Sequence, residues 1–149
     1  MTPPAKFAAA VQALPDEYEL YYRGPVYDVV IKSKIKKKLE RKATNDQLAG
    51  LKDLMERYGE SGFDNMPRGK FNASEERFVN SKGKQVLLQA FKPGQLRVYG
   101  YCQSFNGRPT FFITGFDPVK KQDDADQDVI AASGKEAVAV FDLLSAKGN

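Results

Sequence analysis

The sequence contains no histidine, and this absence excludes several kinds of catalytic site. A Ser-His-Asp triad, a Cys-His dyad and a metal site with imidazole ligands all need that side chain. The only cysteine is Cys102, which excludes an intrachain disulfide framework and a zinc site built from several thiolates. Acid–base chemistry must therefore use Lys, Arg, Tyr, Asp or Glu, and we expect neither a metal nor a cofactor.

Long apolar runs are also missing. No stretch approaches the ~18 apolar residues that cross a bilayer, so we expect no membrane-spanning helix and no membrane partner. The alanine-rich start of the chain runs into Leu14-Pro15-Asp16 instead of a small-residue cleavage site, which argues against a signal peptide. Together with the lone cysteine, these features favour a cytoplasmic protein.

Positive charge, in contrast, is in excess. The chain has 23 Lys and Arg residues against 19 Asp and Glu residues, a formal net charge of +4 and a pI of about 9.1. Such a balance favours an anionic partner. The length of 149 residues and the 42% hydrophobic content are sufficient for one folded domain with a real core.

Three β-rich runs follow one another in the second half of the chain. They are residues 86–91, 95–102 and 110–116, separated by Lys92-Pro93-Gly94 and by residues 104–109. Short breaks with Gly, Pro and Asn between β-branched and aromatic runs are typical of hairpin turns. We therefore predict a three-stranded antiparallel meander at the centre of the fold.

The middle run carries most of the candidate chemistry, because its side chains alternate between two faces. One face is apolar, with Leu96, Val98 and Cys102. The other carries Arg97, Tyr99, Tyr101 and Gln103. We expect this second face to be exposed, either as the ordinary wet side of an antiparallel sheet or as a functional surface.

The segment Lys32–Lys42 has seven basic residues and one acidic residue. Ile35 and Leu39 are four residues apart, so they share one face of a predicted helix. Lys and Arg side chains displace counterions from nucleic acid. The segment is therefore either a solvated helix with nothing bound or an edge that faces phosphates, and the sequence leaves both possibilities open.

Two further helices are predicted from their apolar periodicity. Thr44 and Gln47 form a capping-box pattern ahead of an apolar stripe that ends at Gly59. A second stripe runs from Val129 to Leu144, with a bend or break at Ser133-Gly134. The predicted fold is α+β: a small antiparallel sheet, made of the meander and an N-terminal strand, with two N-terminal helices and a C-terminal helix packed on it. Residues 75–79 are predicted to add a short edge strand.

This order of elements, together with residues 95–121, resembles the RelE/HigB-like toxin superfamily, and most closely its phage-derived HigB-like branch of type II toxin–antitoxin toxins. The segments that carry the resemblance are Leu96-Arg97-Val98-Tyr99-Gly100, Asn106-Gly107, residues 111–116 and Lys120-Lys121. The resemblance implies an N-terminal extension over residues 1–25 and a toxin domain over residues 26–149.

The resemblance also implies a function: a metal-independent endoribonuclease that cleaves mRNA, often on the ribosome, and that a cognate antitoxin protein neutralises. A ribose 2′-hydroxyl would attack the adjacent phosphate. Arg97, Lys120 and Lys121 would bind phosphates, and Tyr99 or Tyr101 would orient the nucleotide or transfer a proton. Further RNA contacts are expected from the lysines of the basic helix and of the later turns, which are Lys36, Lys37, Lys38, Lys82, Lys84 and Lys92.

Two alternatives remain open at this point. A protein with the same fold but without catalysis would inhibit a protein target, or would bind nucleic acid through the basic helix with steep salt dependence. A nuclease should bring Arg97, a tyrosine and lysines together in one concavity. An inhibitor of a protein target should present an apolar patch on the same face instead.

Overall fold

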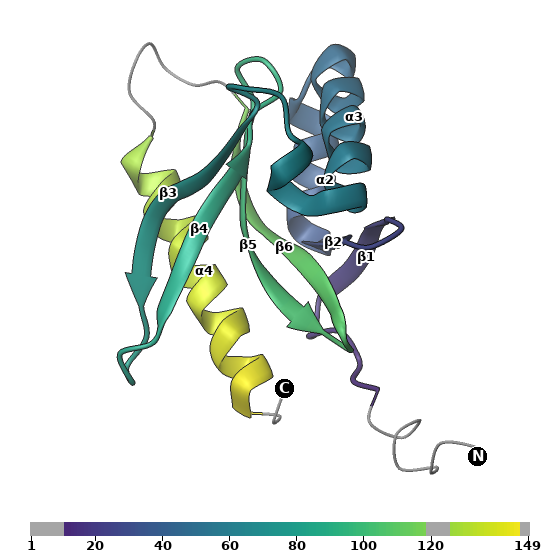
Figure 1. The fold of residues 1–149 in the computed structure, drawn as a ribbon. Coiled ribbons are helices and arrows are strands. Elements are labelled where there is room, and N and C mark those ends of the chain that lie inside the picture. The colour runs from purple at the N-terminus through teal and green to yellow at the C-terminus, as the bar shows by residue number, and fades with distance from the viewer. Residues whose placement is uncertain (1–10, 119–125, 147–149) are drawn as a thin grey trace, which may run out of the picture.

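The computed structural model describes residues 11–118 and 126–146, and it shows one sheet with helices on both faces (Figure 1). The sheet has six strands in the order β1-β2-β6-β5-β4-β3. The strands are β1 (Tyr18–Arg23), β2 (Asp28–Lys32), β3 (Phe71–Val79), β4 (Gln85–Phe91), β5 (Arg97–Phe105) and β6 (Arg108–Asp117). The helices of these residues are α2 (Ser33–Lys42), α3 (Asn45–Ser61) and α4 (Gln127–Ala146), with a 3-10 turn η1 (Gly62–Asn65) after α3. The predicted α+β class is confirmed.

A hydrophobic core lies on each face of the sheet. On one face, α2 and α3 bury Leu39, Leu51 and Tyr58 against strand residues that include Val98 and Phe111. The Tyr58 ring is the centre of this core, since its centroid lies 5.1–5.6 Å from four other aromatic rings. The other partners in this aromatic cluster are Tyr27, Phe71 and Phe91.

The second core lies under α4. The helix buries Ile130, Val140 and Leu144 against residues such as Tyr99 and Phe112 on the opposite face of the sheet. Because both faces are covered, the central strand β6 carries a continuous buried apolar run, Phe111-Phe112-Ile113, instead of an alternating pattern. The protein thus has three layers, with the sheet in the middle.

The predicted small antiparallel sheet, with one N-terminal strand, is wrong in two respects. The sheet has six strands, and it is mixed, because β2 runs parallel to β6 and pairs with it from Asp28↔Thr110 to Ile31↔Ile113. The hairpins β4–β5 and β5–β6 of the predicted meander are present. The β2–β6 pairing joins residues far apart along the chain, so no turn pattern in the sequence could predict it.

The two edges of the sheet also differ from the prediction. Strand β3 is longer than the short edge strand expected over residues 75–79, and its pairing with β4 is irregular between Asn72 and Glu76. Strand β1 pairs antiparallel with β2, so the sheet begins within the segment predicted to be an extension. Both edge strands are irregular, since the register of β1 also shifts between Leu20 and Tyr22.

Helix α4 is continuous through Ser133-Gly134, so the predicted break at these residues is wrong. The small residues allow close packing instead: a Cβ atom on Gly134 would collide with the ring of Phe78. On β6, the register with β5 skips one residue, and this bulge at Thr114 turns two successive residues toward the helix. The Thr114 hydroxyl donates a hydrogen bond to the carbonyl of Ser133 at 2.8 Å, which fixes α4 on the sheet.

Candidate nucleic-acid interface

The alternation of side chains along β5 agrees with the prediction, but the expected exposure of the second face does not. Tyr99 is 1% exposed and Tyr101 is 3% exposed, because both lie beneath α4. Arg97 is half-buried at the start of the strand, where its Nη1 donates to the carbonyls of Gly94 at 2.8 Å and Leu96 at 2.9 Å. The prediction of a solvated face is therefore wrong, because α4 packs on it.

The two buried phenols are neutral at neutral pH. Burial, with a smaller contribution from nearby carboxylates such as Glu75, raises the pKa of Tyr99 to about 12. Burial also raises the pKa of Tyr101, whose hydroxyl donates to Oε1 of Gln103 at 2.7 Å. With α4 in this position, neither ring is open to a nucleotide, and neither is poised to accept a proton.

Because the phenols are buried, the free energy of unfolding is expected to fall at alkaline pH. As pH rises, a phenol whose pKa is raised by folding ionises in the unfolded chain at a lower pH than in the folded protein. Its contribution to stability is complete below the unfolded pKa of about 10 and is lost as pH rises toward the folded value, by about 1.4 kcal/mol per pH unit. For Tyr99 the window extends to about 12. Urea unfolding at a series of alkaline pH values measures the decline, and a free energy of unfolding that stays flat across this window would contradict it.

The predicted RNA-contacting lysines are spread over the surface. Lys82 and Lys84 lie at the turn between β3 and β4, far from α2 (Figure 1). Lys92 follows β4, and its backbone N–H donates to the carbonyl of Lys70 at 2.8 Å. Lys120 and Lys121 lie outside the described residues. Among the described residues, the predicted set does not meet in one concavity.

A basic groove lies instead between α2 and α4, and we call it the α2–α4 groove. Its volume is about 550 Å³. Helix α2 contributes Lys34, Lys38 and Lys42 to the wall, and the floor is residues 114–118 of β6 and the residue after it. The opposite wall comes from Val129, Ala132, Ser133 and Glu136 of α4.

Helical periodicity places the three lysines on one face of α2. Ile35 and Leu39 point into the core, and the residues one position before them, Lys34 and Lys38, recur with Lys42 at intervals of four. One such interval is about 6 Å along the helix axis. All three lysines are exposed, and none makes an ion pair with a described residue.

Two neighbouring lysines of the same segment make ion pairs, and the pair formed by Lys32 lies in the groove itself. The Nζ atom of Lys36 lies 2.9 Å from a carboxylate oxygen of Glu19 on β1, and that of Lys32 lies 3.2 Å from Glu136. Lys37 is exposed and does not line the groove. Of the predicted Lys36, Lys37 and Lys38, only Lys38 therefore faces the groove. The helical spacing of Ile35 and Leu39 places Lys34 and Lys42 on the same face as Lys38, so the sequence could have identified these two lysines as well.

The floor of the groove is the end of strand β6, which lacks a neighbouring strand on one side. Strand β2 pairs with β6 only as far as Ile113, and the chain then turns into α2. The next residues of β6, from Thr114 to Asp117, therefore have no strand beside them on the β2 side within the described part of the protein. Gly115 and Phe116 are partly exposed in this stretch, whereas Thr114 and Asp117 are buried.

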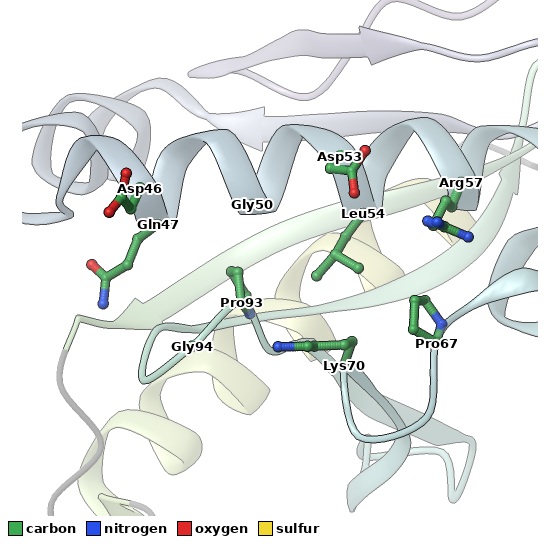
Figure 2. A pocket seen from close by; sticks show the side chains of 10 residues that line it. All are labelled: Asp46, Gln47, Gly50, Asp53, Leu54, Arg57, Pro67, Lys70, Pro93 and Gly94. Atoms are coloured by element: carbon green, nitrogen blue, oxygen red, sulfur yellow. The ribbon is translucent and has the colours of Figure 1, made fainter.

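A second concavity, which we call the α3 cavity, is lined by one face of α3 (Figure 2). Its volume is about 380 Å³, and it lies between α3 and the loops before β3 and after β4. Gln47 lines the α3 cavity, and its Nε2 donates to the carbonyl of Pro118 at 3.4 Å; Pro118 lines the α2–α4 groove. The two concavities thus meet at this contact. Nothing in the sequence pattern predicted either of them.

Comparison with known proteins leaves the family open: no family model, no curated protein and no solved structure matches the chain. In residues 11–118 and 126–146, no group of three His, Cys, Asp or Glu side chains is placed to hold a metal ion. Over the same residues, no helix is both long and apolar enough to cross a membrane.

Proposed function

We propose that this protein binds single-stranded RNA, with the phosphate backbone lying along the α2–α4 groove. The observation that carries the proposal is the row of Lys34, Lys38 and Lys42, exposed on one groove wall and unpaired with any described carboxylate. Their spacing of about 6 Å suits successive anionic groups on a single strand. A positive groove that follows the backbone is a common way to hold single-stranded nucleic acid.

Three acidic residues line the groove, Asp117, Asp126 and Glu136, and the hydrogen bonds of two of them reduce their effect on a bound phosphate. Glu136 accepts hydrogen bonds from Tyr18 at 2.8 Å and from Lys32 at 3.2 Å. Asp126 caps α4, since its Oδ1 accepts from the backbone N–H groups of Asp128 and Val129. The small groove favours one strand over a duplex.

Titration of a labelled, unstructured RNA with the protein tests the proposal. We expect saturable binding that weakens steeply between about 50 and 200 mM salt, as displacement of counterions requires. Duplex RNA of the same length serves as a competitor and is expected to compete less well than the single strand. Absence of binding at the lower salt concentration would overturn the proposal.

Endoribonuclease activity is the second candidate, and the resemblance to RelE/HigB-like toxins remains its main support. After residue 26 the elements run strand, helix, helix, four strands and helix, which is one strand more than the order on which that resemblance rests. The backbone of Arg97 pairs in register with that of Asp117, which lines the groove, but the Arg97 guanidinium donates to the carbonyls of Gly94 and Leu96 and does not line the groove. In this candidate mechanism the guanidinium would exchange these carbonyls for a phosphate and stabilise its charge.

Induced expression in bacteria, with mapping of transcript 5′ ends, tests this second candidate. Growth arrest and new RNA ends are expected for the wild type, and both should be lost in Arg97→Ala. Growth arrest without cleavage would instead support the inhibitor of a protein target. Cleavage that survives Arg97→Ala unchanged would remove Arg97 from the mechanism. Ribosome association and a cognate antitoxin are predictions that this experiment can then address.

A further inference from the structure

We propose that the α3 cavity is a subsite for one base of the bound RNA strand, and that the base is guanine. This inference rests on the proposed RNA binding and names the specificity of the same surface. Three features support it: the partly apolar lining of the cavity, the charged groups around its rim, and its continuity with the α2–α4 groove.

Part of the cavity lining is apolar. Leu54 points from α3 toward the loops, and Pro67 and Pro93 close the opposite side (Figure 2). The cavity is narrow at Gly50, since a Cβ atom added there would lie only 3.2 Å from the Cβ atom of Pro93. A volume of about 380 Å³ falls in the range of sites that hold small ligands, and such sites combine an apolar lining with a few polar groups.

Four charged side chains line this cavity. Asp46 and Asp53 come from α3, Arg57 follows one turn after Asp53, and Lys70 extends from the loop below toward Pro93 (Figure 2). None of the four side chains makes a hydrogen bond or an ion pair with a described residue. Opposite charges around a partly apolar lining suit a flat ligand that has both donors and acceptors on its edge.

Guanine fits this arrangement better than the other three bases. Its Watson–Crick edge presents two adjacent N–H donors beside a carbonyl acceptor. An ionised carboxylate accepts two hydrogen bonds side by side, and Arg57 or Lys70 can donate to the carbonyl oxygen. Adenine, cytosine and uracil each lack the adjacent pair of donors. Unpaired bases are commonly selected through these edges in single-stranded RNA. Asp53 is the expected acceptor, because it lies one turn from Arg57 on the same helix.

The α3 cavity is within reach of a strand that occupies the α2–α4 groove. The hydrogen bond from Gln47 to Pro118 marks the boundary between them. A strand with phosphates on Lys38 and Lys42 at the end of α2 passes directly to the start of α3, because only Ala43 and Thr44 separate the two helices. One nucleotide beyond that point can place its base in the α3 cavity, beside Asp53 and Arg57.

A uridine tract with a single variable base is the probe for this subsite. The base is guanine, hypoxanthine, adenine or cytosine, and affinity is measured by fluorescence anisotropy at constant salt. The wild type is expected to bind the guanine oligomer about tenfold more tightly than the adenine oligomer, as one bidentate contact provides. Hypoxanthine, which lacks the second donor, should lose most of this preference.

Asp53→Asn is the decisive variant, and Glu56→Gln is its matched control. Each removes one negative charge from an exposed position of α3, but Glu56 does not line the cavity. Both should bind all oligomers slightly more tightly, and only Asp53→Asn should lose the preference for guanine.

Equal binding of all four oligomers by the wild type, with salt dependence intact, would overturn the guanine subsite alone. A preference that survives both Asp53→Asn and Asp46→Asn would also overturn it. Failure to bind any oligomer would instead overturn the proposed function.

Discussion

Alanine at Gly115 is expected to lower the free energy of unfolding by about 3 kcal/mol, because α4 lies too close to β6 for a side chain at that position. An added Cβ atom would collide with the hydroxyl of Ser133 and would lie 2.9 Å from its Cβ atom. The helix cannot easily move away, since the hydrogen bond from Thr114 to the Ser133 carbonyl is buried. Urea denaturation of Gly115→Ala beside the wild type measures the loss.

The double variant G115A/S133G separates this collision from other effects. Glycine at the helix position removes the hydroxyl and the Cβ atom, and leaves Cα 3.4 Å from the new methyl group. Most of the lost stability should return, less the ~1 kcal/mol that glycine costs within a helix. The single variant S133G measures that cost directly. If G115A/S133G is as unstable as the sum of its single variants, the collision partner has been misidentified.

Replacing Lys34, Lys38 and Lys42 together with glutamine is expected to remove most of the salt-dependent affinity for RNA. Each phosphate contact on a single strand contributes about 0.7 to the slope of log affinity against log salt, so the slope should fall by about 2. At about 0.1 M salt this corresponds to roughly 100-fold weaker binding. The three side chains are exposed, so the fold should be unaffected.

The matched control replaces Lys82, Lys84 and Lys92, which carry the same total charge and were also predicted to contact RNA. They lie away from the α2–α4 groove, so their loss should change the slope by much less than 1. Circular dichroism checks that both variants are folded. Equal losses from the two triple variants would mean that binding is non-specific attraction to a basic protein, and the groove would then have no special role.

Local features of the fold were predictable from the sequence, because neighbouring residues specify them. The capping box of α3 is present as expected: the Thr44 hydroxyl accepts from the N–H of Gln47 at 3.1 Å, and Gln47 Oε1 accepts from the N–H of Thr44 at 3.0 Å. The basic helix, the hairpins of the meander and the alternation of faces along β5 were equally accessible. Each depends on a periodicity or a turn within a few residues.

The features that decide the candidate site depend on contacts between distant segments. The alternation along β5 is the same whether its second face meets water or a helix, and only the packing of α4 shows that Tyr99 and Tyr101 are buried. Likewise, the positive charge of α2 could be read from the sequence, but the groove beside it could not. The groove exists because β2 ends beside Ile113 while β6 continues. Sequence periodicity assigns a residue to a face and does not identify the segment that covers it.

The position of β6 has a consequence for how the protein forms during synthesis. This strand lies between β2 and β5, yet it is the last strand to be made. Until β6 leaves the ribosome, no strand connects the β1–β2 hairpin to the sheet formed by β3, β4 and β5. The chain therefore gains its central pairings and its second core late and almost together, and neither half is expected to fold stably on its own.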